Sequence, residues 1–280
     1  MIFPREIGPF KWFLRVVSLS LIYFLAARWG LSMALVNEQS SPVWPPSGIA
    51  VISLSAWGLG MWPGVFLGAF LANWYTSSHL ISSLGIAIGN TLEAIASVYV
   101  LSRWAKNLST HNQVLVFLWG GVMLPAAISA ANGPLWLIWF NGTPANLYWQ
   151  IWLVWWIGDV LGIMILYPVW LCRMEYVQKY KYFLWLALAI LGIGLSGMTF
   201  LGHTKTAYLA LIPIFVATMH GGLAGLSLSA LLTSVIAIYG TQAGLGPFRS
   251  LLELQAFIGL PFLCLLLMSV HVVHKDLVAR

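Results

Sequence analysis

The chain of 280 residues is 60% hydrophobic and only 7% charged, whereas soluble globular proteins carry about 25% charged residues. This composition excludes a soluble enzyme or binding module and indicates an integral membrane protein. The formal net charge of +6 comes from basic residues scattered over separate loops, so we expect no nucleic-acid partner.

Hydrophobic runs cover nearly the whole chain, many of them near the roughly 20 apolar residues that a membrane-spanning helix needs. Because backbone groups in lipid must be hydrogen-bonded internally, we expect an all-α, polytopic helix bundle with about 8 to 10 hydrophobic segments. The segments are placed at 12–36, 45–59, 61–76, 81–102, 113–140, 148–172, 183–201, 206–219, 222–241 and 251–274. The first is too long for the apolar core of a signal peptide, so it is expected to remain.

Two of these segments are predicted to be irregular. Segment 45–59 would be only about 22 Å long against a hydrocarbon core of about 30 Å, so it should begin in a recess or pair with its neighbour. Segment 113–140 contains Asn132, Gly133 and Pro134 in succession. This run predicts a broken helix or a short re-entrant turn.

The basic residues predict the orientation in the membrane. With both termini cytoplasmic, only Lys205 and Arg249 fall outside and Arg28 lies within a span. The remaining basic residues that we count fall inside, namely Arg5, Lys11, Arg15, Arg103, Lys106, Arg173, Lys179, Lys181, Lys275 and Arg280. This asymmetry favours two cytoplasmic termini.

Three charged residues, Arg28, Glu93 and Asp159, interrupt apolar runs. Glu93 and Asp159 are predicted about 16 to 18 Å below the outer surface, and Arg28 about 12 Å below it. A charge at this depth costs about 2.5 to 3.5 kcal/mol, so we expect Arg28 to pair with one of the carboxylates or all three to line a polar cavity. A structural ion-pair core without a ligand stays open as an alternative.

The neighbours of these charges favour a polar interior. Residues at helical spacing share a face with Glu93, namely Gly89, Asn90 and Ser97, and others share a face with Asp159, namely Trp155, Trp156, Gly162 and Ile163. We expect one outward-facing pocket and a possible small-molecule ligand. The candidate ligand-binding or switch residues are Arg28, Trp44, Pro45, Ser47, Asn73, Asn90, Glu93, Trp156 and Asp159.

Pro45 and Pro46 suit the first turn of a helix, whose free N–H groups would attract an anion or a carbonyl group. No catalytic residue, metal site or cofactor emerges. Cys172 and Cys264 lack a C-x-x-C spacing and a histidine partner at the same depth. We therefore expect no enzyme activity and no metal site.

Four ordered motifs resemble a known family. They are WPPSGIA at 44–50, MWPGVFLGAFLAN at 61–73, GNTLEA at 89–94, and WIGDVLG at 156–162 with Pro168 following. Together they are similar to the bacterial membrane-associated sensor domains of the first MASE type, which are usually assigned eight helices.

The resemblance implies a sensory input domain in the bacterial cytoplasmic (inner) membrane. Such domains are fused to cytoplasmic diguanylate cyclases, cyclic-di-GMP phosphodiesterases or histidine kinases, which implies a signalling output domain as partner, lipid contact and a homodimer. Nothing in residues 1–280 resembles an output domain. We therefore expect a single integral membrane sensor domain over 1–280, with its output domain absent from this chain and its last helix as the transmitter.

Other function classes stay open at this point. A membrane anchor and protein-docking platform would need no small-molecule ligand. A small-solute transporter would also use charges and broken helices at mid-membrane depth, although no inverted repeat is evident. A membrane-embedded enzyme would need a nucleophile beside a base.

Overall fold

A computed structural model of the chain describes residues 8–32, 41–77, 79–171, 190–192, 194–199, 207–245 and 247–278. Within these ranges the structure is helical without strands, which confirms the all-α fold class. The chain divides into two compact units. The first comprises Met1–Lys106 and Leu115–Met164, and the second Asn107–Val114 and Ile165–Arg280. A single functional domain over 1–280 stays a prediction.

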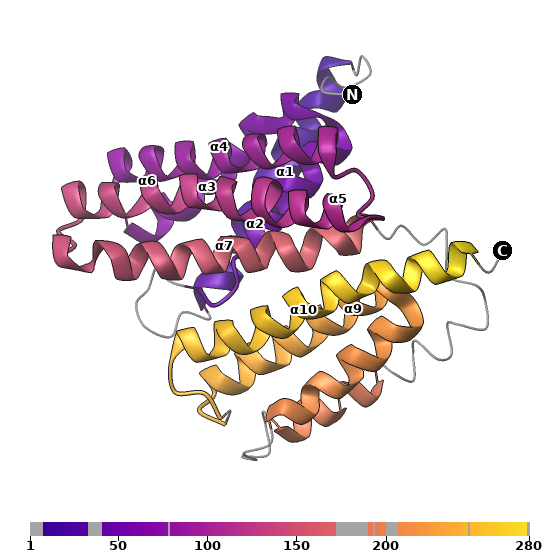
Figure 1. Cartoon of the computed structure of the whole chain (residues 1–280). Coiled ribbons are helices and arrows are strands. Elements are labelled where there is room, and N and C mark those ends of the chain that lie inside the picture. The colour runs from indigo at the N-terminus through magenta and orange to yellow at the C-terminus, as the bar shows by residue number, and fades with distance from the viewer. Residues whose placement is uncertain are drawn as a thin grey trace. The chain divides into compact units, whose positions relative to one another are not determined.

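The first unit is a bundle of helices around α4 (Figure 1). Its α-helices are α1 (Pro9–Ser32), α2 (Pro45–Trp57), α3 (Trp62–Ser77), α4 (Leu80–Trp104), α6 (Leu124–Phe140) and most of α7 (Tyr148–Leu171). Shorter elements are η1 (Leu59–Met61), the π-helical η2 (Phe117–Met123) and η3 (Ala145–Leu147), while α5 (His111–Val116) lies at the unit boundary. Because α4 packs against α2, α3, α6 and η2, its buried face forms the core of this unit.

Small residues determine how closely α1 and α3 approach. Gly64 and Gly68 are one turn apart on α3, and a Cβ on Gly68 would lie 2.6 Å from Cβ of Tyr23. Ser20 Oγ donates a hydrogen bond to the carbonyl oxygen of Gly64 at 3.1 Å. This small-xxx-small spacing is typical of membrane helices whose backbones touch.

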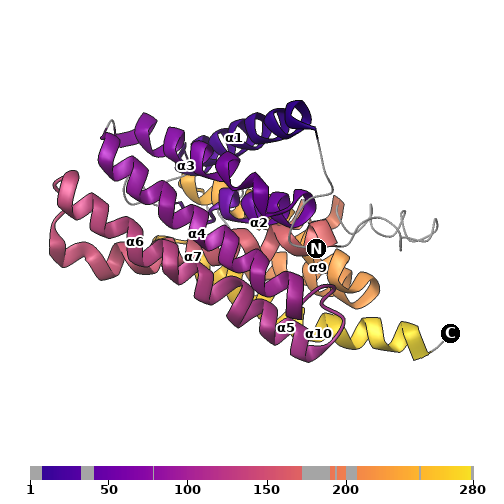
Figure 2. The same ribbon diagram turned by 90° about the horizontal axis from the view of Figure 1, so that it is seen from above.

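The second unit contains a pair of long helices. After η5 (Ala207–Ala210), helix α9 (Leu211–Gln242) packs against α10 (Leu251–Val278), and both views show them side by side (Figure 2). The backbone of α9 is non-helical at Gly222, with φ 56° and ψ −136°. Ser250 and Glu253 form a cap at the start of α10, where Ser250 Oγ accepts from the Glu253 N–H at 3.2 Å.

In the part of the chain that the structure describes, six helices are long and apolar enough to cross a membrane: Pro9–Ser32, Leu80–Trp104, His111–Phe140, Ala145–Leu171, Gly222–Gln242 and Leu251–Ser269. The predicted segment 206–219 corresponds to η5 and the first part of α9, and segment 222–241 corresponds to the part of α9 from the Gly222 kink onward. Helices α2 and α3 are too short to be among the six. Most of segment 183–201 lies outside the described residues, and the larger segment count and the cytoplasmic termini stay predictions.

The break predicted at Asn132, Gly133 and Pro134 is wrong, because α6 continues through all three residues. Asn132 Nδ2 donates to the carbonyl oxygen of Gly85 on α4 at 2.7 Å, and Gly133 lies directly against Trp155 of α7. These contacts hold the helix together around Pro134. The irregularity occurs earlier, in η2, where Gly121 lets the Leu101 side chain of α4 approach the backbone.

Candidate functional site

Two carboxyl groups are buried together in the first unit. Glu93 of α4 is 1% exposed and Asp159 of α7 is 4% exposed, and the two lie within electrostatic range of each other. Ser47 Oγ, at the start of α2, donates a hydrogen bond to Asp159 Oδ1 at 3.0 Å. The sequence prediction that Glu93 and Asp159 share a polar interior is thus consistent with the geometry.

Glycines on α7 bring Asp159 to the start of α2. The Trp44 N–H donates to the carbonyl oxygen of Gly158 at 2.9 Å. The Trp44 carbonyl oxygen lies so close to Gly162 that a Cβ there would overlap it. Two residues without side chains therefore let α7 contact the backbone that leads into Pro45. The start of α2 also directs its partial positive charge toward Asp159.

A tyrosine and an asparagine extend the polar cluster toward α1. Tyr23 is 1% exposed, and its hydroxyl donates to Asn90 Oδ1 at 3.0 Å. Asn90 Nδ2 in turn donates to the Ile86 carbonyl oxygen at 2.9 Å. Sequence reasoning placed Asn90 on the face of Glu93, but it missed Tyr23, which looks like any other aromatic residue of an apolar run.

Glu93 has no hydrogen-bond partner among the residues that the structure describes, and neither does the hydroxyl of Ser97 one turn further on. The hydroxyls of Ser47 and Ser129 lie near the Glu93 carboxyl group, yet neither completes a hydrogen bond to it. A buried polar group in this state lowers the stability of the fold by about 1 to 3 kcal/mol. A buried ionisable group without a hydrogen-bond partner is therefore a candidate for a functional role rather than a structural one.

The expected pairing of Arg28 with a carboxylate is not formed. Its guanidinium carbon lies 4.2 Å from the ring centroid of Tyr75, and both oxygens of Glu93 lack a partner in the described part of the chain. Arg28 is only half-buried. For Arg28, the cation–π contact with the ring of Tyr75 is more favourable than extending the side chain into the core to reach a buried carboxyl group.

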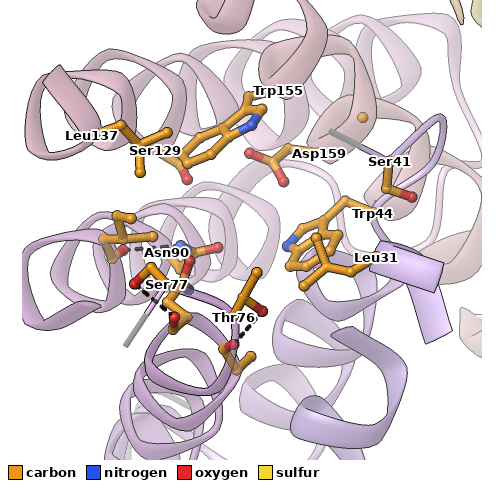
Figure 3. Close-up of a pocket in the computed structure, with 14 residues that line it drawn as sticks. Leu31, Ser41, Trp44, Thr76, Ser77, Asn90, Ser129, Leu137, Trp155 and Asp159 are labelled. Carbon is orange, nitrogen blue, oxygen red and sulfur yellow. Dashed lines mark hydrogen bonds between the residues drawn. The ribbon is translucent and has the colours of Figure 1, made fainter. Parts of the chain in front are cut away.

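A cavity of about 40 Å³ opens beside Asp159. The side chains of Trp44 and Trp155 lie on either side of the Asp159 carboxyl group (Figure 3). Ile86 and Leu137 form an apolar part of the wall. The polar groups on the wall besides the aspartate come from Ser41, Asn73, Thr76, Ser77, Asn90 and Ser129.

The candidate residues fall into three groups. Trp44, Asn73, Asn90 and Asp159 line the cavity. Ser47 and Glu93 are buried next to those residues, and Pro45 directly follows Trp44 and is partly buried; none of the three lines the cavity within the described chain. Arg28 and Trp156 contact other groups. Arg28 lies over the ring of Tyr75, and Trp156 Nε1 donates to the Met123 carbonyl oxygen at 2.9 Å, which joins α7 to the end of η2.

Sequence reasoning missed several wall residues. Trp155 was placed on the face of Asp159, yet Trp156 was chosen as the candidate. Ser129 was not among the predicted site residues, although it is a polar residue within the apolar run 113–140 and is 2% exposed. Ser41, Thr76 and Ser77 carry no signal in the sequence that separates them from ordinary loop and helix-end residues.

The described residues contain no group of three or more His, Cys, Asp or Glu side chains that could hold a metal ion. Cys264 lies exposed on α10. Chemically, the arrangement can bind a small molecule that contacts a carboxyl group and two indole rings.

Of three comparisons with known proteins, one gives a match, and it covers most of the chain. No curated protein and no solved structure matches the chain. The model of the MASE1 family matches residues 15–274, which include all four sequence motifs and both units. This match confirms the resemblance seen in the sequence, and the chain belongs to MASE1, a family of membrane-associated sensor domains.

Proposed function

We propose that this chain is the sensory input domain of a bacterial signalling protein, and that its stimulus is a small molecule bound in the cavity beside Asp159. The observation that supports this most is the position of Asp159, which lies on the cavity wall and also joins α7 to α2 through Ser47. A ligand that contacts Asp159 would act directly on a contact between two helices. It needs only a different affinity for two helix arrangements to shift their populations.

Two helices are suited to carry the signal away. Helix α7 continues from Asp159 to Leu171 as one helix and so extends from the first unit into the second. In the second unit, α10 is the last helix of the described chain and packs against α9. In this proposal α10 transmits the signal to a cytoplasmic output that turns over cyclic-di-GMP or acts as a histidine kinase, in a homodimer in the inner membrane with cytoplasmic termini.

The test replaces Asp159 by asparagine in the full chain joined to a diguanylate cyclase output. Asp159→Asn keeps the size and the hydrogen-bonding capacity but removes the charge. A coupling free energy of about 1 to 3 kcal/mol would change the output roughly 5- to 150-fold. Cyclic-di-GMP produced per molecule of correctly inserted protein is the measurement.

The matched control is Glu253→Gln, which removes an exposed carboxylate at the start of α10 and keeps an oxygen that can accept from the Arg249 N–H. We expect output within about twofold of wild type, since an exposed charge contributes little. If Asp159→Asn also leaves the output at the wild-type level across growth conditions, the sensory proposal fails. The membrane anchor and docking platform would then be the better account.

A further inference from the structure

We propose that the cavity beside Asp159 selects a small primary ammonium ion, of about three or four non-hydrogen atoms, as its ligand. The inference rests on the proposed sensory function only in taking this ligand as the stimulus. Four properties of the cavity carry it: charge, aromatic walls, the direction of its hydrogen-bonding groups, and size.

The ionisable side chains at the cavity are acidic. Asp159 lies on its wall, and none of the residues that line it in the described chain is a lysine, arginine or histidine. The second carboxyl group, Glu93, lies in the core behind it without a hydrogen-bond partner there. The nearby Arg28 is engaged by the ring of Tyr75. In a medium of low dielectric constant this arrangement attracts a cation and repels an anion.

Aromatic faces flank the carboxyl group. Trp44 and Trp155 are seen on either side of Asp159 (Figure 3). Indole is the best aromatic partner of a cation, with a stabilisation of about 0.5 to 2 kcal/mol that is largest where water is excluded. A carboxyl group between two indoles is therefore suited to an ammonium group.

Two hydroxyl groups of the wall offer acceptors rather than donors. Each hydroxyl has one proton, and at Ser41 and Thr76 that proton is already used on a backbone carbonyl oxygen, at 2.6 and 2.9 Å respectively. What these two groups present to a ligand is a lone pair.

The amides of the wall are only partly used. Asn73 and Asn90 each direct one of their two N–H groups at the backbone of their own helix, at 2.8 and 2.9 Å. The second N–H of each amide can donate to an oxygen of the ligand, whereas the hydroxyl oxygens need donors that the ligand supplies. A primary ammonium group brings three, whereas a carboxylate or phosphate brings none.

The size of the cavity limits the ligand. A cavity needs roughly 10 to 15 Å³ by this measure for each water molecule, so about 40 Å³ holds about three groups of that size. An ammonium group with a chain of two or three further atoms fits. A nucleotide or a quinone does not.

The experiment measures binding of ethanolamine to the full chain in detergent, by calorimetry and by the shift of the unfolding temperature. Ethane-1,2-diol is the uncharged counterpart of the same size, and glycolate is the anionic one. We expect ethanolamine to bind saturably and at least about tenfold more tightly than either, since an ion pair in a dry cavity is strong. Two results overturn the proposal. One is binding of the diol or of glycolate that is as tight as that of ethanolamine, or tighter. The other is the absence of ethanolamine binding at concentrations up to about 50 times a typical metabolite level of about 1 mM.

Variants locate the site independently of the ligand series. Asp159→Asn should weaken ethanolamine binding about tenfold or more, and Trp44→Leu about 2- to 30-fold, while Trp44→Phe keeps most of it. Glu253→Gln should bind as wild type. Ethanolamine binding that survives Asp159→Asn unchanged would place the ligand elsewhere and overturn the assignment. Because the ligand series uses wild-type protein, a variant that fails to fold does not remove the test.

A free amine and the headgroup of phosphatidylethanolamine share the primary ammonium group. Nanodiscs of phosphatidylcholine with and without phosphatidylethanolamine distinguish these two sources. Competition of the lipid with ethanolamine assigns the ligand to the membrane, and undisturbed ethanolamine binding assigns it to the solution. Both results keep the ammonium specificity.

The experiments distinguish a wrong ligand class from a wrong sensory function. Ethanolamine that binds at Asp159 but leaves the output of the fused cyclase unchanged supports the ligand class and contradicts the sensory function. An output that depends on Asp159 in a protein that binds no amine supports the function and contradicts the ligand class.

Discussion

The first unit contains the cavity beside Asp159, and the second unit contains a smaller cavity between α9 and α10. The two cavities differ in the charged and polar groups on their walls. The second cavity measures about 10 Å³, and the residues that line it in the described chain carry no charge. Its hydroxyl groups have partners: Ser234 Oγ donates to the Ala230 carbonyl oxygen at 2.7 Å, and Ser196 Oγ donates to Thr233 Oγ1 at 3.4 Å.

The first cavity is larger, has Asp159 on its wall, and lies next to a carboxyl group without a hydrogen-bond partner among the described residues. Imperfect packing of two apolar helices is enough to explain a space like the second cavity. It does not explain why two buried carboxyl groups are kept together. The second cavity therefore has the properties of a packing defect, whereas the first has those of a binding site. Three predictions test this difference.

The largest effect is expected where α7 touches the start of α2. Gly162→Val would drive a side chain into the Trp44 carbonyl oxygen and should lower the free energy of unfolding by about 3 kcal/mol or more, since backbone cannot move as a side chain can. The control is Gly197→Val in the second unit, where a Cβ meets nothing within 4 Å. Unfolding in detergent measures both. Equal effects would show that the contact with Trp44 is not specific.

Removal of a buried carboxyl group should act in the opposite direction. Glu93→Leu replaces a group without a partner by an apolar one of similar size, so we expect the free energy of unfolding to rise by about 1 to 3 kcal/mol. Ser234→Ala, which removes a satisfied hydrogen bond, should lower it by about 0.5 to 1.5 kcal/mol. A stability loss in Glu93→Leu would mean that this carboxyl group is a structural element like the groups of the second unit.

The smallest effect concerns the edge of the site. Arg28→Gln should cost only about 0.5 to 1 kcal/mol, the contribution of an exposed cation–π contact. In double-mutant cycles, Arg28 should couple to Tyr75 and show no coupling to Glu93. A coupling free energy above about 1 kcal/mol between Arg28 and Glu93 would restore the ion pair that the sequence suggested.

The sequence was sufficient to predict the helical fold and which polar residues share a helix face. Helical spacing placed Asn90 and Glu93 on one face, and both are buried there. Gly162 was assigned to the face of Asp159, and it lies against the start of α2. These predictions hold because spacing along a helix fixes which residues share a face.

Contacts between helices were harder to predict. Depth in the membrane suggested a partner for Arg28, but the direction of its side chain selected Tyr75. Trp155 and Trp156 differ by one position, hence by about 100° around the helix, and the sequence does not say which of them faces α4. The continuity of α6 through Pro134 likewise depends on contacts with Gly85 and Trp155, which lie far away in sequence.

The π-helical stretch η2 affects how this chain would tolerate a change in its length. A π-helical stretch arises when one extra residue is accommodated in an α-helix. Deletion of one residue within 117–123 would return the stretch to regular α-helix and leave the residues that follow close to their present faces. Deletion of one residue in the regular helix, within 124–128, would instead turn everything that follows by about 100°. Ser129 would then leave the cavity and Asn132 would lose Gly85. The π-helical stretch is therefore a place where the length of the chain can change while the wall of the site keeps its rotational register.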